Sequence, residues 1–439
     1  MDFEGKVLDT SIVTTHSWRP NCLPSRKRSS SSAVALDLRF KGALRRSDVN
    51  SKIFSKSSVD FPFLYLLEKQ CRFFRVLTIV SYEVTSHTLM KKDSLAFRFI
   101  YRMYNSNCFG PWYTRRQLNR VHEKRPNGHS SSATFTYGDI TIKAVPQNSD
   151  NYSYVVVCDS TNDCVVIDVG DARPILQCLY DEKRTPHAVL VTHKHWYPFN
   201  VFVIRDHCYG NKELKKRFKN LDIYGGEIDR PSDVNMYIRN ETLIHIGRLH
   251  FKAFHVPGHT AGHMIYALQL NDELKCLFTG DFLFIAGIGK IFEGSTSQMI
   301  SSLLMLNHFS PDTIIFPGHE YAKLNLSFAL SLEKDNEVLK AMSKTVQEKR
   351  NTRSPIVGIT LGDEYKINPY LRTCSLKFRK ALVAAGYNVP AEGKVVGGRD
   401  VDEVKDSSME AQVAVFDALE KAKNNFIEEL MKQMEQKSH

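Results

Sequence analysis

Ala188-Val189-Leu190-Val191-Thr192-His193-Lys194-His195-Trp196 is the stretch that decides the fold, because an apolar run leads directly into two histidines one residue apart. The apolar run predicts a buried strand. In open α/β sheets, ligands gather beyond the carboxyl ends of strands, and a rigid strand can hold two imidazoles toward one ion. The His-x-His pair is therefore typical of a metal-binding loop, although one pair among 16 histidines could arise by chance.

Three later segments repeat this arrangement of an apolar strand followed by a short turn that carries His or Asp. Residues 254–263 place His259 in a Gly-rich turn, where the backbone can bend tightly. Residues 277–281 end on Asp281, and residues 314–321 contain His319. Four such segments in one chain predict a shared metal centre.

From about residue 140 to its end, the chain resembles the metallo-β-lactamase superfamily and, within it, the hydroxyacylglutathione hydrolase (glyoxalase II) family. The superfamily pattern is Thr-His-x-His-x-Asp-His, then a later His, a bridging Asp and a final His. The residues that match it are His193, His195, His259, Asp281 and His319.

The first motif departs from this pattern, because Asp206-His207 comes nine residues late, after the additional residues 197–205. We interpret these nine residues as an insertion, and an untranslated segment left in a gene model would look the same. If the insertion bulges outward, Asp206 and His207 remain ligands, since the entropy of loop closure grows slowly with length. Otherwise the chain would hold one metal.

The resemblance implies two divalent metal ions. It implies Zn²⁺ on three histidines and Asp281, and a second Zn²⁺ or Fe on Asp206, His207, His319 and the shared Asp281. A water between the ions would be hydroxide at neutral pH, since metal binding lowers its pKa to roughly 7. Asp206 and Asp281 are accordingly the expected catalytic residues.

The expected reaction is hydrolysis of a thioester of glutathione or a similar thiol. The thiolate leaves readily because its conjugate acid has a pKa of roughly 8.5, so no separate general acid is required. Asp168 follows the apolar run 165–167 and resembles the family's carboxylate that steadies the metal loop. An Asp that ends a strand in a turn is an equally good interpretation.

Five residues are candidates for substrate binding by the same resemblance. Lys290 matches a family contact to glutathione, Phe292 occupies a tyrosine position without the hydroxyl, and Tyr321 matches another contact. A loose alignment of residues 418–426 places Lys421 and Lys423 where basic residues grip the glycine carboxylate of glutathione. Both lysines could equally lie on a solvated helix face, because a lysine lacks the bidentate fork of arginine.

The whole excess of positive charge in the chain lies in its N-terminal part. Up to Tyr137 there are 23 Lys and Arg against 10 Asp and Glu, whereas the remainder has 36 against 38. No nucleic-acid-binding motif accompanies this charge, so we expect no nucleic acid partner. Aromatic residues interleave with arginines in 97–116, which favours membrane-surface association or targeting, and a disordered basic leader fits equally well.

Nine scattered cysteines without a secretory leader indicate a reducing, intracellular compartment, either cytoplasmic or mitochondrial. No stretch reaches the roughly 18 uninterrupted apolar residues of a membrane span.

The coarse pattern predicts an α/β fold, a metallo-β-lactamase αββα sandwich with a C-terminal all-α domain and a basic, largely unstructured N-terminal extension. The expected strands are 135–145, 152–159, 165–168, 251–256, 263–270 and 274–279, with a helix at 175–182 and helices from 324 on. The expected domains are a disordered leader (1–90), a basic aromatic segment (91–134), a hydrolase domain (135–319) and a helical domain (320–439).

Two other functions remain open. A mononuclear iron persulfide dioxygenase would use a facial triad resembling His193, His259 and Asp281. A catalytically weak binding protein, tethered by its N-terminus, would show low metal occupancy.

Overall fold

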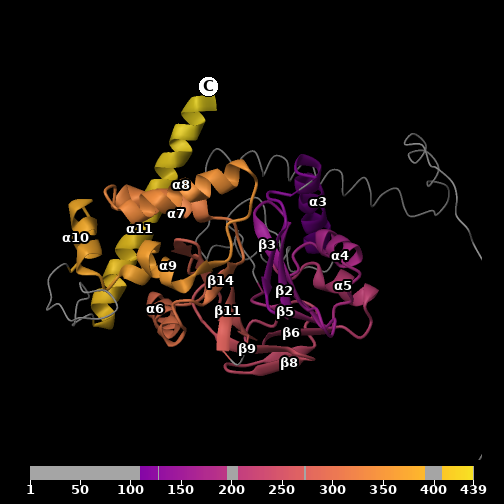
Figure 1. Ribbon diagram of the computed structural model, residues 1–439. Helices are drawn as coiled ribbons and strands as arrows, with labels where there is room; N and C mark the ends of the chain where they lie inside the picture. The colour runs from indigo at the N-terminus through magenta and orange to yellow at the C-terminus, as the bar shows by residue number, and fades with distance from the viewer. Residues whose placement is uncertain (1–108, 127, 195–205, 271–272, 391–407, 439) are drawn as a thin grey trace, which may run out of the picture. The chain divides into compact units, whose positions relative to one another are not determined.

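The computed structural model describes residues 109–126, 128–194, 206–270, 273–390 and 408–438 (Figure 1). The expected leader (1–90) and the additional residues 197–205 lie outside the described residues, as does His195.

The first sheet carries the strand expected before the His-x-His motif. It has seven strands in sequence order, antiparallel from β1 to β4 and parallel from β4 to β7. Their bounds are β1 Ala133–Tyr137, β2 Ile140–Gln147, β3 Asn151–Cys158, β4 Cys164–Ile167, β5 Ala188–Val191, β6 Asp222–Gly226 and β7 Met236–Ile238. All four residues of β5 are buried, as expected for a parallel strand covered on both faces.

The second sheet has the order β15-β14-β11-β10-β9-β8, in which only the β11–β14 pair is parallel. Its strands are β8 Leu243–Ile246, β9 Leu249–His255, β10 Met264–Leu270, β11 Glu273–Gly280, β14 Ile314–Pro317 and β15 Ile359–Thr360. Between β11 and β14 lies a small hairpin of β12 (Leu283–Phe284) and β13 (Gly287–Ile288).

The two sheets pack face to face over an aromatic core. Tyr154 of the first sheet meets Phe278 and Phe316 of the second, with ring centroids 5.3 Å apart in both pairs. Helices α4 (Ala172–Asp181) and α5 (Asn211–Arg217) cover the outer face of the first sheet, and α6 (Thr296–Leu304) lies on the second (Figure 1). The predicted αββα sandwich is confirmed.

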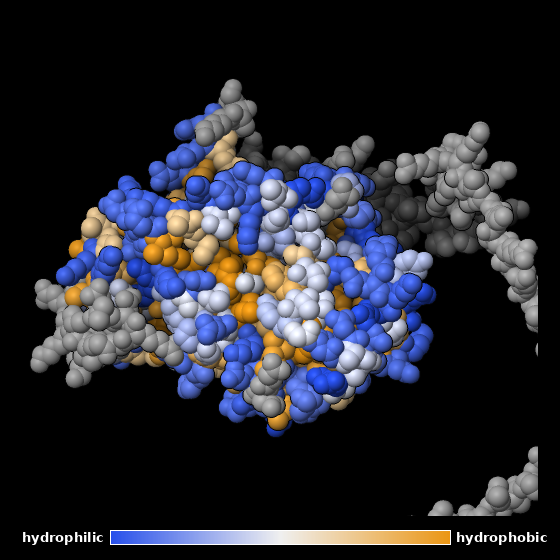
Figure 2. Space-filling view, in the orientation of Figure 1, coloured by the Kyte–Doolittle hydropathy of each residue, from blue (hydrophilic) through white to orange (hydrophobic). Residues whose placement is uncertain are grey.

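The C-terminal region is helical, as predicted. It comprises α7 (Ala322–Leu332), α8 (Glu337–Asn351), α9 (Leu361–Ile367), α10 (Leu376–Ala384) and α11 (Met409–Ser438). Three of its side chains hold the β12–β13 hairpin that follows Asp281. Asn325 donates to Ile285 O, Asn368 donates to Gly287 O, and Glu364 accepts from the Ala286 amide. Apolar surface gathers where these helices meet the sandwich (Figure 2).

Two expectations on local structure need correction. The single strand expected at 135–145 is a hairpin of β1 and β2, because Gly138 adopts φ +59° and turns the chain. The basic aromatic segment 91–134 contains a helix, α3 (Phe109–Lys124), which buries Leu118 and whose Asn119 accepts a hydrogen bond from Arg173 at the start of α4.

Among the described helices, none is both long enough and apolar enough to cross a membrane.

Candidate metal centre

The first group of predicted ligands lies around one oxygen of Asp281. His193 follows β5, His259 lies in the turn between β9 and β10, and Asp281 follows β11, so all three are presented at strand ends. The Nε2 atoms of His259 and His193 lie 3.3 and 3.9 Å from Asp281 Oδ2.

The second group lies around the other oxygen of the same carboxylate. The Nε2 atoms of His207 and His319 are 3.2 and 3.3 Å from Asp281 Oδ1, and His319 Nε2 is also 3.4 Å from Asp206 Oδ2. Asp206 and His207 therefore reach the centre although they follow the additional residues 197–205. Six of the seven predicted ligands converge, and the seventh, His195, lies outside the described residues.

The donor set fits two divalent cations that share Asp281. The four described imidazoles and two carboxylates offer nitrogen and oxygen donors, which suit Zn²⁺ or Fe. The three-residue combinations whose donor atoms lie within 4.8 Å of one another are His193, His207 and Asp281, and Asp206, His207 and His319. His207 belongs to both combinations, so the two groups are contiguous.

The pKa values of the buried residues indicate a centre built for positive charge. Burial lowers the pKa of His207, but the carboxylates of Asp281 and Asp206 outweigh this effect and raise it to about 10. Burial raises the pKa of Asp281, but His319 and His207 hold it well below its usual range. Since bound metals require deprotonated ligands, cations at this centre would replace the protons that His207 and His319 otherwise attract.

Two glycines leave room for the ligands. A Cβ on Gly318 would lie 2.8 Å from His207 Cε1 and 2.9 Å from Asp281 Oδ1. A Cβ on Gly289 would lie 1.9 Å from the backbone oxygen of Asp281. Side chains at either position would therefore displace the bridging carboxylate.

Asp168 positions the loop that carries His193 and His207. Its Oδ2 accepts from His207 Nδ1 at 2.9 Å and from Thr192 Oγ1 at 2.7 Å, and its Oδ1 accepts from the Thr192 amide at 2.8 Å. Its backbone has φ +53°, a conformation that few residues other than glycine adopt. Of the two interpretations of Asp168 from sequence, this geometry supports the carboxylate that orients a ligand.

Replacing Asp168 with Asn is expected to weaken binding of the second metal by roughly 10- to 100-fold, because the amide no longer fixes the His207 ring through a charged acceptor. Titration of the metal-depleted protein against a competing chelator measures this affinity. Asp163→Asn, a change of the same kind away from the ligands, should leave it unaltered. Equal affinities for Asp168→Asn and the unmodified protein would contradict the orienting role.

Sequence reasoning missed several residues that position the ligands. Asp150 Oδ1 lies 2.9 Å from His319 Nδ1, and Asn151 Nδ2 donates to Asp206 Oδ2 at 3.0 Å. Asp150 ends the turn between β2 and β3 and Asn151 is the first residue of β3, and an Asp-Asn pair is ordinary composition at such a turn. Only their position opposite His319 distinguishes them.

Asp229 joins two metal loops. Its Oδ2 accepts from Thr260 Oγ1 at 2.6 Å and from the Lys194 amide at 3.2 Å, while its Oδ1 accepts from the Gly262 amide at 2.8 Å. The loop after β5 and the turn after β9 are therefore fixed to one buried carboxylate.

His263 supports the ligands His193 and Asp281. Its ring stacks on that of His193 with centroids 4.6 Å apart, and its Nε2 accepts from the Asp281 amide at 3.1 Å. Because Nε2 is an acceptor here, the bond requires the neutral form of His263.

Three of the predicted substrate-binding residues adjoin the ligands. The Lys290 backbone oxygen lies 2.8 Å from His259 Nδ1, and its exposed side chain places Nζ 5.9 Å from the centroid of the Phe292 ring. The Phe292 ring packs against that of His259 with ring centroids 5.1 Å apart, and the Tyr321 ring stacks on that of His319 with centroids 4.8 Å apart.

Lys421 and Lys423 lie on α11 instead. Lys423 places Nζ 5.6 Å from the Tyr370 ring centroid, and burial lowers its pKa. Lys421 is exposed. Within the described part of the chain, neither lysine contacts a metal ligand or another predicted substrate residue, so their role remains a prediction.

Two family models match the chain. Residues 148–319 match the metallo-β-lactamase superfamily, and residues 320–426 match the hydroxyacylglutathione hydrolase C-terminus. The chain is 37% identical over 225 residues to a hydroxyacylglutathione hydrolase of Pelagibacter ubique. The aligned region covers 51% of this chain and 89% of that protein. It is 32% identical over 287 residues to one of Aliivibrio fischeri, covering 65% of this chain and all of that protein.

A solved structure of ETHE1 from Myxococcus xanthus is similar at 22% identity and a TM-score of 0.39, covering 59% of this chain and 92% of that one. The chain thus matches nearly the whole length of these two hydroxyacylglutathione hydrolases, and its own two family regions meet between His319 and Glu320. The chain belongs to the hydroxyacylglutathione hydrolase (glyoxalase II) family of the metallo-β-lactamase superfamily.

Proposed function

We propose that the protein is a metal-dependent hydrolase of thioesters, with S-acyl glutathione as the substrate class. The observation that carries this proposal is the Asp281 carboxylate, which faces His193 and His259 with one oxygen and His207 and His319 with the other. Relatives that are 32 to 37% identical are named hydroxyacylglutathione hydrolase, which supports the same activity.

The cofactors we propose are two divalent ions, Zn²⁺ at the His193 side and Zn²⁺ or Fe at the His207 side. When bound, they supply Lewis acidity toward a carbonyl oxygen and lower the pKa of water to roughly 7. Asp281 holds both positions in a fixed relation. The thiolate leaves without a separate general acid because its conjugate acid has a pKa of roughly 8.5.

Asp206 is the carboxylate better placed to take up a proton from the attacking water. Its side chain is 14% exposed, whereas that of Asp281 is 5% exposed and shared between both ligand groups. Asn151 Nδ2 fixes the Asp206 carboxylate at 3.0 Å. Asp206 therefore has the most exposed side chain among the described ligands.

The surroundings of the ligands favour a substrate with apolar and anionic parts. The Phe292 and Tyr321 rings pack against His259 and His319, and Lys290 adds an exposed cation beside Phe292. A glutathione thioester offers an acyl group for the ring surfaces and carboxylates for the lysine.

The test is steady-state hydrolysis of S-lactoylglutathione by the full chain, measured through the release of the free thiol. A matched lactoyl thioester of N-acetylcysteamine shows whether the glutathione moiety contributes. Hydrolysis should cease after metal removal by a chelator and return with added Zn²⁺. Absence of turnover of both thioesters by protein that carries two metals per chain would overturn the proposal.

An iron persulfide dioxygenase would need only His193, His259 and Asp281. The convergence of Asp206, His207 and His319 on the same carboxylate favours the hydrolase instead. Oxygen consumption with glutathione persulfide would separate the two activities.

Removal of residues 197–205 is expected to leave metal binding at two ions per chain, because Asp206 and His207 already lie at the centre in the full chain. Elemental analysis of the two purified forms measures this stoichiometry. Two ions in the deletion variant but one or none in the full chain would show that the nine residues obstruct the site.

A further inference from the structure

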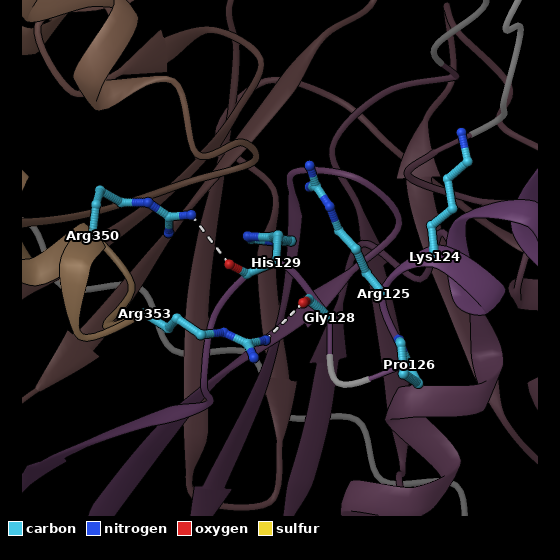
Figure 3. A pocket seen from close by; sticks show the side chains of 7 residues that line it. All are labelled: Lys124, Arg125, Pro126, Gly128, His129, Arg350 and Arg353. Atoms are coloured by element: carbon cyan, nitrogen blue, oxygen red, sulfur yellow. Dashed lines mark hydrogen bonds between the residues drawn. The ribbon is translucent and has the colours of Figure 1, made fainter.

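A second cluster of charged side chains lines a cavity of about 380 Å³ (Figure 3). Of the described residues that line it, four are lysine or arginine and none is acidic. These four cations are Lys124, Arg125, Arg350 and Arg353. None of the described metal ligands contributes to the lining, so this cavity is distinct from the described metal centre.

The four cations come from segments far apart in the sequence. Lys124 ends α3 and Arg125 follows it, whereas Arg350 lies in the last turn of α8 and Arg353 just beyond it. In Figure 3, Arg350 and Arg353 reach from α8 toward the backbone of the loop that leads to β1, and Lys124 and Arg125 lie on the α3 side. The tertiary fold thus concentrates positive charge that no single segment contains.

Hydrogen bonds to the backbone fix the arginines in place. Arg350 donates to His129 O at 3.1 Å, Arg353 donates to Gly128 O at 2.8 Å, and Arg125 donates to Ser149 O at 2.8 Å. Arg350 also donates to Ser130 Oγ at 2.8 Å. An arginine has five N–H donors, so Arg125 and Arg350 retain donors beyond these bonds to described residues.

The charge of the cluster is only partly balanced. The Glu320 carboxylate, whose side chain is 5% exposed, lies 3.6 Å from Arg350 Nη1. Cations in the last turn of a helix are stabilised by the helix dipole, which accounts for Lys124 and Arg350. Arg125 and Arg353 lie past the helix ends, where this stabilisation falls off. Arg125, Arg353 and Lys124 carry like charges that repel one another, and an anion in the cavity would relieve this repulsion.

We propose that this cavity binds a small phosphate-bearing anion. Its volume lies within the range of small-molecule sites, roughly 300 to 1,000 Å³. Guanidinium groups match the oxygens of a phosphate with two parallel N–H bonds, and lysine adds a point charge. Cations from opposite sides suit an anion with several charged oxygens, such as a diphosphate, better than a single carboxylate.

A chain of polar contacts connects the lining of the cavity to residues that position the metal ligands. His129, on its lining, places Nε2 2.8 Å from the backbone oxygen of Asn151. Asn151 in turn donates to Asp206 and lies 3.2 Å from His319 Nε2. Because phosphates also coordinate divalent metals, binding at the cavity has to be measured separately from binding at the metal centre.

The test is isothermal titration of the metal-loaded full chain with inorganic pyrophosphate, repeated with Asp281→Ala to remove the metal centre as a competitor. The double variant Lys124→Gln/Arg353→Gln removes one cation from each side and should weaken binding at least tenfold in both backgrounds. Lys349→Gln is the control, because Lys349 is exposed on α8, close in sequence to Arg353, and does not line the cavity. Thermal unfolding of each variant checks that it is folded.

Three results would overturn the proposal. One is absence of binding at millimolar pyrophosphate in the Asp281→Ala background. Another is equal weakening by Lys349→Gln, which would indicate a general effect of net charge. The third is binding only to vesicles that contain phosphoinositides, which would assign the phosphate chemistry to a lipid headgroup rather than to a free anion.

Discussion

Replacing Asp281 with alanine is expected to remove both metal ions and to lower kcat/KM for the thioester by roughly a thousandfold, or about 4 kcal/mol of transition-state stabilisation. The reason is that one carboxylate serves both ligand groups. Its Oδ2 faces His259 at 3.3 Å, and its Oδ1 faces His207 at 3.2 Å. Elemental analysis and steady-state kinetics on the same preparation measure the two effects.

Asp281→Asn gives a graded comparison. The amide keeps one oxygen in the same place, so it can serve one ligand group but not both, and at most one metal per chain is expected. Asp312→Asn, in the exposed turn before β14, should retain two metals and full activity. Two tightly bound metals in Asp281→Ala would show that the carboxylate is not shared, and the centre would need a different assignment of ligands.

The ligands could be predicted from sequence because each follows a strand with a clear apolar pattern. His193, His259, Asp281 and His319 come directly after β5, β9, β11 and β14 or within their connecting turns. Strand ends at one edge of two packed sheets meet in space, so a local pattern suffices to predict which residues converge.

The positioning residues could not be predicted in this way. Asp150 precedes its partner His319 by 169 residues, and nothing in the intervening pattern relates them. Asp229 lies in a turn after β6, a place where aspartate is common for local reasons, and only the approach of Thr260 and Gly262 shows its role. Tertiary packing of loops decides such pairs.

The basic cavity illustrates the same limit. The excess of positive charge before Tyr137 is evident from composition, but composition does not show that the end of α3 meets the end of α8. Arg350 and Arg353 belong to the part of the chain that is nearly neutral overall. A charged site assembled from two regions is therefore visible only in the folded chain.

Gly170→Ala is expected to remove the second metal while leaving the first. An ideal Cβ at this position would lie 1.9 Å from the Asp206 backbone oxygen and 2.6 Å from its carbonyl carbon. Backbone atoms cannot yield as the end of a flexible side chain can, so the loop that carries Asp206 and His207 must move away. We expect the stoichiometry to fall from two metals to one, with a loss of about 3 kcal/mol in unfolding free energy from overpacking.

Gly138→Ala separates these two effects. Gly138 has φ +59°, and no atom of the described residues lies within 4 Å of its ideal Cβ, so alanine there costs backbone strain of about 1 to 2 kcal/mol without touching the loops that carry the ligands. If both variants lost a metal, general destabilisation would explain the result. If only Gly170→Ala lost a metal, the close approach of Gly170 to Asp206 would be what keeps this ligand in position after the nine additional residues. Retention of two metals by Gly170→Ala would show that the loop can relax without losing its ligands, and that Asp168 and Asn151 suffice to position them.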